Sequence, residues 1–368
     1  MAGLTFIQGN ELFNFSATHC LRNDYVYNEC SACIDICPEN AFHLVRNKLT
    51  LFENECIACG VCLGSCPTEA LTMKSFDPNN YVASFTNEKI ISCKDDSSCL
   101  AAFDAHHFIN MALSSEENIS CDMAHCSECI LNKDQKAETF IRQELAVSNS
   151  FLENCQKSIL LIEEIQDEDT IEVNKAEVEN VSVPSRRIFF TQTMEGSEGS
   201  EEEYFSLTEE NRKKTTTQVP LKVKKLHEIL QKNIALFETT KFEETSPLFF
   251  NKKIKFETCT NCGDCTQFCP TGALFNADDK LGIVFTAGIC IDCDICEHIC
   301  KTDAITPSNS YDLVEIAYKR SCELVRFEMV MCVECRCPYP YRGGDPICDR
   351  CVSFKNDMPN MFVMAKDI

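Results

Sequence analysis

The chain has 368 residues, 28 of them cysteine, and a formal net charge of −23 at pH 7. This many cysteines indicates bound metal in a reduced intracellular chain, because a disulfide scaffold requires secretion and residues Met1 to Phe6 show no signal peptide. The acidic excess argues against nucleic acid as a partner, and no apolar run is long enough to span a bilayer. We therefore expect a cytoplasmic metalloprotein without membrane insertion.

Residues 1–80 contain a repeated cysteine spacing. Four cysteines read C-x2-C-x2-C-x3-C-P: Cys56, Cys59, Cys62 and Cys66. Three more give the last three positions of a copy just upstream: Cys30, Cys33 and Cys37. Tyr27 stands where this copy should begin. Either Cys20 completes the set, or the set has three thiols, alone or with a non-cysteine ligand such as His19. The alternation over residues 42–52 around a turn predicts a hairpin between the two copies.

Residues 85–165 alternate strands and helices, which predicts a small α/β domain. The expected elements are strands over 89–93, 118–121 and 157–162, with helices over 99–113 and 135–155. This order gives a parallel sheet whose ligands gather at the carboxyl ends of the strands. Four cysteines near that edge predict a metal site, unless several are buried thiols: Cys93, Cys121, Cys126 and Cys129. Cys99 is the alternative fourth ligand, and the metal is zinc or an iron–sulfur cluster.

The rest of the central region carries no further predicted ligand. His106 and His107 would lie on a partly exposed helix face, and Cys155 would be a structural thiol. Residues 166–220 are acidic and polar and cannot bury enough apolar surface to order themselves, which predicts a flexible linker. Its basic and aromatic segment, residues 185–190, either docks a partner or packs back on a neighbouring domain.

Residues 221–250 hold an amphipathic helix, expected over 221–238, and a connector. The lysines of this helix form either a solvated face or a contact with an acidic domain: Lys222, Lys224, Lys225 and Lys232. The cysteine spacing then returns over residues 251–310 in two copies that have all four cysteines, although Lys301 replaces the final proline of the second. They are Cys259, Cys262, Cys265 and Cys269, followed by Cys290, Cys293, Cys296 and Cys300.

Residues 311–368 contain six more cysteines. Two C-x2-C pairs, separated by twelve residues, predict a metal knuckle: Cys332, Cys335, Cys348 and Cys351. Four thiolates would close a tetrahedron around zinc or a single iron and would stabilise a segment too small for its own core. An iron–sulfur cluster is the alternative, and Cys322 and Cys337 have no assigned role.

The repeated spacing resembles the ligand run of bacterial-type ferredoxins that hold two 4Fe–4S clusters. Residues 20–75 and 255–306 each resemble one such domain, which makes the chain similar to a polyferredoxin. In that family three thiolates of one motif and the last thiolate of the other hold each cluster, which implies four sites. Site 1 would be Cys20, Cys30, Cys33 and Cys66, and site 2 would be Cys37, Cys56, Cys59 and Cys62. Site 3 would be Cys259, Cys262, Cys265 and Cys300, and site 4 would be Cys269, Cys290, Cys293 and Cys296.

The expected fold class is α+β, with two ferredoxin-like domains flanking the small α/β domain and a C-terminal metal knuckle. The resemblance implies electron transfer without catalysis of its own, by a polyferredoxin or by the iron–sulfur wiring subunit of an anaerobic redox enzyme such as a formate dehydrogenase or hydrogenase. Redox enzymes with basic docking surfaces are the expected partners, because acidic carriers are attracted to them. The alternatives are a redox-sensing or metalloenzyme-assembly protein, and an enzyme with a substrate-binding cluster in its middle domain.

Overall fold

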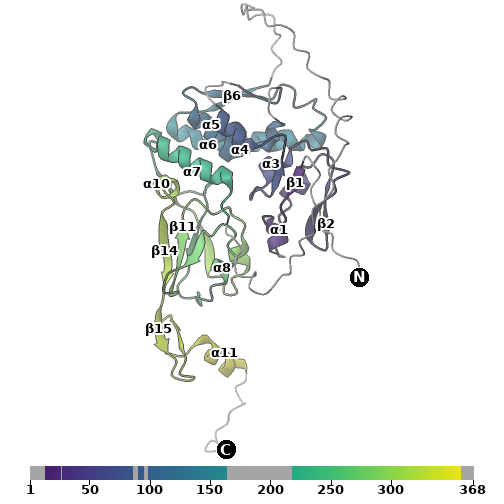
Figure 1. Ribbon diagram of the computed structural model, residues 1–368. Helices are drawn as coiled ribbons and strands as arrows, with labels where there is room; N and C mark the ends of the chain where they lie inside the picture. The colour runs from purple at the N-terminus through teal and green to yellow at the C-terminus, as the bar shows by residue number, and fades with distance from the viewer. Residues whose placement is uncertain (1–12, 26, 86–89, 95–97, 164–217, 358–368) are drawn as a thin grey trace, which may run out of the picture. The chain divides into compact units, whose positions relative to one another are not determined.

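A computed structural model describes residues 13–163 and 218–357, except 26, 86–89 and 95–97 (Figure 1). The described residues belong to one compact unit. The linker predicted over 166–220, with its segment 185–190, lies outside the described residues apart from the last three positions. Within the described part of the chain, no helix is both long and apolar enough to cross a membrane.

The N-terminal region consists of two small antiparallel sheets and several short helices. β1 (Phe13–Phe15) pairs with β4 (Leu71–Met73), and β2 (Phe42–Val45) forms the expected hairpin with β3 (Lys48–Leu51). The helices are α1 (Leu21–Asp24), α2 (Ala32–Ile36), α3 (Cys62–Ser65) and α4 (Pro78–Ser84). Both α2 and α3 contain one motif cysteine and end directly before another, Cys37 and Cys66 respectively. Each of these short helices therefore supplies thiols to two sites.

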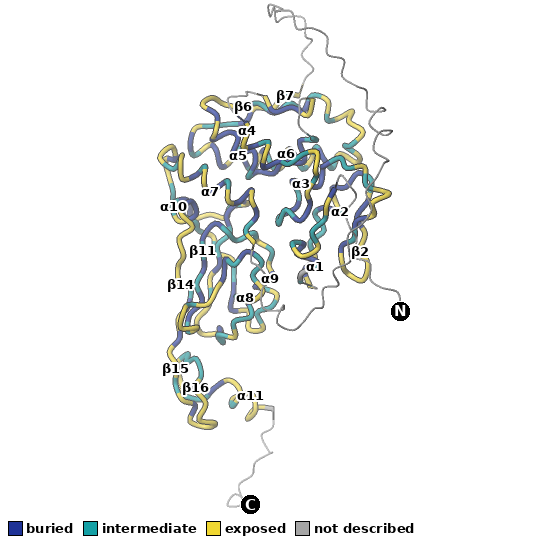
Figure 2. Tube along the Cα trace, in the orientation of Figure 1, coloured by how far each residue is buried: buried dark blue, intermediate teal, exposed yellow. Residues whose placement is uncertain are grey.

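The middle region contains a three-stranded parallel sheet with the order β5-β6-β7. The strands are β5 (Ile90–Ser92), β6 (Ile119–Asp122) and β7 (Ile159–Ile162). The helical segments are η1 (Leu100–Ala102), α5 (Ala105–Ser114), η2 (Lys133–Gln135), α6 (Lys136–Leu152) and η3 (Glu153–Cys155). One face of the sheet buries Ile91 and Cys121, whereas Ile90 and Leu160 on the other face are exposed. Figure 2 shows how buried and exposed residues are distributed along the chain.

The helix expected over 99–113 is interrupted at Asp104. Residues 100–102 form a short 3-10 helix, and α5 begins after Asp104, whose carboxylate accepts a hydrogen bond from the His107 backbone N–H at 3.3 Å. Aspartate favours this capping position because its side chain satisfies an otherwise unpaired helix donor. His107 is buried rather than on an exposed face, and its Nδ1 lies 2.7 Å from Asp104 Oδ1.

The C-terminal region begins with α7 (Leu221–Asn233) and η5 (Ile234–Leu236), which together end two residues before the expected boundary. An antiparallel sheet follows with the order β10 (Leu274–Asn276), β11 (Gly282–Thr286) and β14 (Ser321–Arg326). Two strand pairs flank it: β8 (Lys241–Phe242) with β13 (Tyr311–Asp312), and β9 (Asn251–Ile254) with β12 (Ile305–Ser308). The short helices are α8 (Asp264–Gln267), α9 (Ile295–His298) and α10 (Leu313–Ala317). The tail forms a hairpin of β15 (Glu328–Met331) and β16 (Pro338–Tyr341), followed by α11 (Asp349–Asp357).

Helix α7 packs between the middle and C-terminal regions. Its Leu226 and Leu230 belong to the same buried apolar cluster as the cores of the N-terminal and middle regions. On another side, His227 Nε2 lies 3.0 Å from the carbonyl oxygen of Gly288. Gly288 has φ +81°, and a Cβ there would lie 2.8 Å from that nitrogen, so glycine permits this contact. A separate apolar cluster, which includes Leu274, fills the C-terminal sheet.

Candidate metal centres

The three complete C-x2-C-x2-C loops share one backbone conformation. In each loop the residues on both sides of the middle cysteine have φ between 50° and 82°: Ala58 and Gly60, Asn261 and Gly263, Asp292 and Asp294. Non-glycine residues seldom adopt a positive φ. When residues with positive and negative φ alternate, their successive backbone N–H groups point into one concavity, which is a known anion-binding arrangement at phosphate and iron–sulfur sites. The upstream loop, which has Tyr27 in place of its first cysteine, differs, with φ −130° at Ser31.

The last cysteine of each motif is followed by a turn of fixed form. The residue three positions later has positive φ in all four copies: Asn40, Glu69, Gly272 and Asp303. In three copies the next backbone N–H then donates to the cysteine Sγ, from Ala41 to Cys37 (3.4 Å), Ala70 to Cys66 (3.3 Å) and Ala304 to Cys300 (3.2 Å). Such donors favour the thiolate, which is the form that binds metal.

Each crossed set of four thiols is brought together. Three cavities are lined by the cysteines of site 2, site 3 and site 4 respectively. In site 1, burial raises the pKa of the Cys33 thiol, and the nearby thiols of Cys66, Cys20 and Cys30 raise it further. Cys20 therefore lies with this set despite its unusual sequence distance. Cys33 also interacts with Cys62, which places sites 1 and 2 next to each other.

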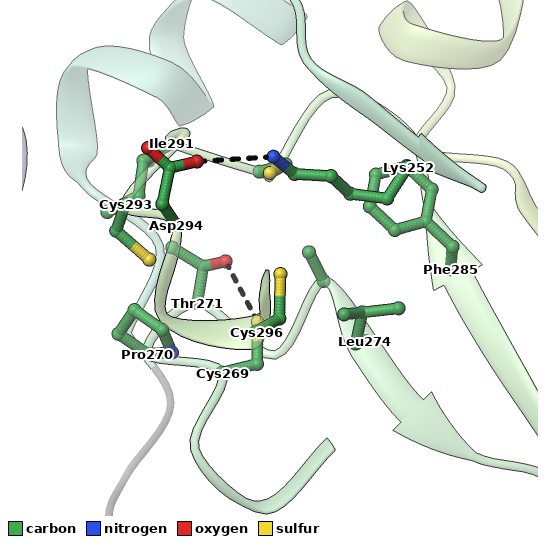
Figure 3. A pocket seen from close by; sticks show the side chains of 12 residues that line it. Lys252, Cys269, Pro270, Thr271, Leu274, Phe285, Ile291, Cys293, Asp294 and Cys296 are labelled. Atoms are coloured by element: carbon green, nitrogen blue, oxygen red, sulfur yellow. Dashed lines mark hydrogen bonds and ion pairs between the residues drawn. The ribbon is translucent and has the colours of Figure 1, made fainter. Parts of the chain in front are cut away.

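Site 4 illustrates how the donors suit an iron–sulfur cluster. Cys269 of one motif faces Cys293 and Cys296 of the other, with Leu274 and Phe285 as an apolar wall (Figure 3). Burial raises the pKa of the Cys290 thiol to about 12, although the backbone N–H of Asp292 opposes this. Thiols in such an apolar place become thiolates only with a bound cation, and thiolates are the usual ligands of iron–sulfur clusters.

Comparisons with known proteins agree with this donor set. Residues 251–301 match the family described as the 4Fe–4S dicluster domain, and residues 49–72 match the 4Fe–4S binding domain. The ferredoxin of Methanothermococcus thermolithotrophicus is 38% identical over 47 residues, which are 12% of this chain and 78% of that protein. The chain belongs to the 4Fe–4S ferredoxin family.

Two further ferredoxins show how much of the chain this relationship covers. Ferredoxin-1 of Rhodobacter capsulatus is 40% identical over 57 residues, which are 14% of this chain and 85% of that protein. The ferredoxin of Rickettsia felis is 33% identical over 58 residues, which are 16% of this chain and 53% of that protein. The expected resemblance to 4Fe–4S ferredoxins is thus confirmed, and the chain is an iron–sulfur electron carrier in its ferredoxin domains.

The middle domain of the chain gathers five cysteines at the carboxyl edge of its parallel sheet. Cys93 directly follows β5, Cys121 lies in β6, and Cys126 and Cys129 occupy the turn after β6. Cys99 joins them: burial raises the pKa of its thiol to about 12, with added contributions from Cys126, Cys129 and Cys93. The four predicted ligands and their alternative are therefore all near one another.

This middle site adjoins site 2. Ser98, the residue before Cys99, donates from Oγ to the carbonyl oxygen of Cys59 at 2.8 Å. Gly60 has φ +77°, and a Cβ there would lie 2.6 Å from Ser98 Oγ, so the close approach requires glycine. A ligand loop of site 2 and the cysteine-rich edge of the middle domain are therefore in direct contact.

The C-terminal knuckle has a different size from the ferredoxin sites. The Sγ atoms of Cys332, Cys335, Cys348 and Cys351 all lie within 4.8 Å of one another, and no other group of ligand side chains in the described residues is this tight. Two of the Sγ–Sγ distances are 3.9 Å and 3.7 Å. A tetrahedral ion with Zn–S bonds of about 2.3 Å requires sulfurs about 3.8 Å apart. The set therefore fits a single ion, whereas Cys337 and Cys322 are exposed and lie outside it.

The sequence interpretation missed Asn28, which connects the two ferredoxin domains, and left open whether Lys222 is solvated or contacts an acidic domain. Asn28 donates from Nδ2 to the carbonyl oxygen of Cys293 (3.1 Å) and accepts at Oδ1 from the backbone N–H of Cys30 (3.0 Å). Lys222 donates from Nζ to the carbonyl oxygen of Cys66 (2.7 Å). A signal for Lys222 exists, because it precedes Leu226 by four residues and so lies on the apolar stripe of α7. No comparable signal marks Asn28.

Proposed function

We propose that this protein is a multi-cluster electron conduit, either a polyferredoxin or the iron–sulfur wiring subunit of a redox enzyme such as a formate dehydrogenase or hydrogenase. Sites 1 to 4 would each hold one 4Fe–4S cluster, which accepts and returns one electron when bound. The observation that carries the proposal is the junction at Asn28, whose side chain hydrogen-bonds a ligand residue of site 1 and a ligand residue of site 4.

Contacts between ligand-bearing elements support one row of sites in the order 2–1–4–3. Helices α2 and α3, which supply thiols to sites 1 and 2, pack against each other. Asn28 connects site 1 to site 4. Helices α8 and α9 pack together in the same way and supply thiols to sites 3 and 4. A row of adjacent sites with one end in each ferredoxin domain is what a conduit requires.

The middle site would extend the row beyond site 2. Five thiols are more than one metal centre needs, so four ligate and one is spare. Unlike the knuckle, this group within the described residues does not bring its ligand atoms within 4.8 Å of one another. That wider spacing favours an iron–sulfur cluster over a single ion. We expect Cys121→Ala to reduce iron content, and the comparison of Cys99→Ala with Cys129→Ala to identify the spare thiol.

The remaining features favour a carrier that docks on other proteins. The net charge of −23 would attract redox enzymes with basic docking surfaces. Zinc in the knuckle would order β15, β16 and α11, a segment with little apolar core.

The deciding experiment is anaerobic metal and sulfide analysis combined with an EPR-monitored redox titration of the full chain. Four clusters require about sixteen irons, a cluster in the middle site raises this to about twenty, and the knuckle adds about one zinc. Reduced clusters that interact magnetically would support the row. About eight irons in a fully reconstituted sample, or clusters that do not reduce reversibly, would overturn the conduit proposal and favour the redox-sensing or assembly role.

A further inference from the structure

Three cationic side chains are buried in the part of the chain that the structure describes. The exposed fractions are 7% for Arg22, 4% for Lys222 and 3% for Lys252. Removing a charge from water is unfavourable unless it finds compensating partners. The positions of these three residues therefore need an explanation.

All three lie beside site 1 or site 4. Arg22 donates from Nε to the carbonyl oxygen of Cys30 (2.7 Å), and Lys222 donates from Nζ to that of Cys66 (2.7 Å), so both adjoin ligand residues of site 1. Lys252 lines the cavity of site 4 together with its four cysteines (Figure 3). These are the two sites that meet at Asn28.

The partners of these cations leave their positive charges facing the sites. Arg22 Nη1 binds the neutral amide oxygen of Asn47 (2.8 Å). Lys222 Nζ pairs with the buried carboxylate of Asp104 (2.7 Å), which lies among the middle-region helices rather than in the ligand loops. In each case the cationic group itself, and not its partner, touches the carbonyl of a ligand residue.

Lys252 has three acidic partners, and its side chain is more buried than those of all three. Its Nζ lies 2.6 Å from Glu297, 2.9 Å from Asp292 and 3.5 Å from Asp294. The Lys252 side chain is 1% exposed, whereas those of Glu297, Asp292 and Asp294 are 25%, 39% and 51% exposed. Water screens the exposed carboxylates more strongly, so the field of Lys252 at site 4 is reduced less than theirs.

Within the described residues, the cations near sites 2 and 3 are more exposed than those near sites 1 and 4. Lys133 near site 2 is exposed and pairs with Glu39. At site 3, Lys301 lines the cavity but is exposed, and Arg342 is partly exposed and pairs with Asp349. Water therefore screens these cations more strongly than it screens Arg22, Lys222 and Lys252.

We propose that Arg22, Lys222 and Lys252 make sites 1 and 4 the highest-potential sites of the row, so that the first electrons taken up rest at the Asn28 junction. Reduction adds one electron, and hence one negative charge, to a cluster, and a nearby fixed cation stabilises that product more than the oxidised cluster. The lysines remain protonated throughout, so no proton accompanies the electron. The inference rests on the proposed four-cluster function.

The first test compares two neighbouring lysines of β9 in the full chain, loaded with iron and sulfide and titrated anaerobically with a small-molecule reductant. Lys252→Met removes the buried charge, and Lys253→Met removes the same charge from an exposed position. We expect Lys252→Met to make reduction of the clusters with the highest-potential signals about tenfold less favourable. For one electron this lowers their midpoint potentials by 59 mV. Lys253→Met should leave every EPR-detected midpoint in place.

The second test concerns site 1. Lys222→Met alone would remove the lysine partner of the buried Asp104 carboxylate and leave it only its histidine contacts, so the variant combines Lys222→Met with Asp104→Asn. Lys224→Met, on the exposed face of the same helix, is the matched control. We expect the double variant to make reduction of the high-potential clusters about tenfold less favourable, which lowers their midpoints by 59 mV. Lys222→Arg, which keeps the positive charge, should leave these midpoints in place, a distinction that a merely structural role would not produce.

The outcomes separate this inference from the function on which it rests. Shifts confined to the lowest-potential signals, or shifts no larger than those of the two controls, would overturn the assignment of potentials while iron content remains full. About eight irons in the wild-type chain would instead overturn the four-cluster function itself.

Discussion

The side chain of Asn28 donates to the carbonyl oxygen of Cys293 across 3.1 Å, although 265 positions separate the two residues in the chain. Asn28 is buried, and its Oδ1 accepts from the backbone N–H of Cys30, so both ends of the amide are satisfied. Close by, the rings of Tyr25 and Phe268 contact each other at a centroid distance of 6.0 Å. One polar side chain and an aromatic contact thus fasten a loop of the first ferredoxin domain to a loop of the second.

Replacing Asn28 should loosen this junction without removing a metal ligand. Asn28→Ala leaves the Cys293 carbonyl and the Cys30 amide without their partner, which should lower the free energy of unfolding by about 1–3 kcal/mol. Asn28→Asp keeps the acceptor for Cys30 but faces the Cys293 carbonyl with a carboxylate, so it should destabilise at least as much. Thermal unfolding together with iron analysis measures both effects.

Asn14, exposed on β1, provides the control for Asn28, and Asn14→Ala should unfold at the wild-type temperature. Iron content should stay constant in all three variants. An Asn28→Ala protein as stable as the wild type would show that the hydrogen bond to Cys293 does not hold the domains together.

Cys20 should be the fourth ligand of site 1. It is buried at the start of α1, and burial raises the pKa of its thiol, with added contributions from Cys66 and Cys30. Cys20→Ala should therefore convert a four-iron to a three-iron cluster and reduce the iron content by about one. EPR of the oxidised protein and iron analysis would both report this change.

Cys155→Ala is the matched control, because this buried thiol donates to the Leu152 carbonyl (3.2 Å) and joins no cysteine set. Wild-type iron content in Cys20→Ala would contradict the prediction. The fourth ligand would then be sought at His19, the alternative left open by the sequence.

The sequence predicted the local features of these sites better than the contacts between them. The loops around Cys56 and Cys259 follow from spacing, because a few consecutive residues determine their shape. The contacts of Asn28 with Cys293, of Lys222 with Cys66 and of His227 with Gly288 join positions between 61 and 265 residues apart. Each depends on the folded arrangement of separate elements, which a single sequence does not encode in its local pattern.

The sequence left open whether the four lysines of α7 form a solvated face or contact an acidic domain, and the structure shows two of each kind. Lys224 and Lys232 are exposed, whereas Lys222 contacts Cys66, and Lys225 donates to the Asn79 carbonyl (2.6 Å). The helix packs its first turn against the N-terminal domain, so the lysines on that side find carbonyl partners. Composition predicted a basic helix, but only the packing shows which lysines are buried.

The knuckle should bind one zinc ion independently of the ferredoxin sites. Cys348→Ser removes a sulfur that lies 3.7 Å from Cys335 Sγ, so zinc should fall from about one per chain to near zero. Residues 328–357 should then become sensitive to limited proteolysis, because metal binding and folding are coupled in such small segments. Iron content should not change.

Cys337→Ser is the control for the knuckle, since this exposed thiol contacts only the carbonyl of Cys335 among the described residues. It should retain both metals. A loss of about four irons from Cys348→Ser would instead assign a cluster to the knuckle and contradict the single-ion geometry.

His227 should make the stability of the α7 contact depend on pH. Burial lowers the pKa of His227 from 6.5 to about 4, the Gly288 carbonyl opposes this, and Lys319 lowers it further. Within the described residues Nδ1 is buried without a hydrogen-bond partner, so protonation would place an unpaired charge there. Because the folded pKa is depressed, the stabilisation is complete above about pH 6.5 and is lost as pH falls toward 4. Between pH 7 and pH 5 the free energy of unfolding should fall by about 2 kcal/mol from this group alone.

The measurement compares His227→Gln with the wild type, because glutamine retains an N–H donor for Gly288 but does not titrate. Clusters are sensitive to acid in both proteins, so the informative quantity is the difference between their unfolding temperatures at each pH. We expect the wild type to be the more stable protein at pH 7 and to lose most of that advantage by pH 5. A difference that stays constant over this range would show that His227 is already protonated, or solvated, in the folded protein.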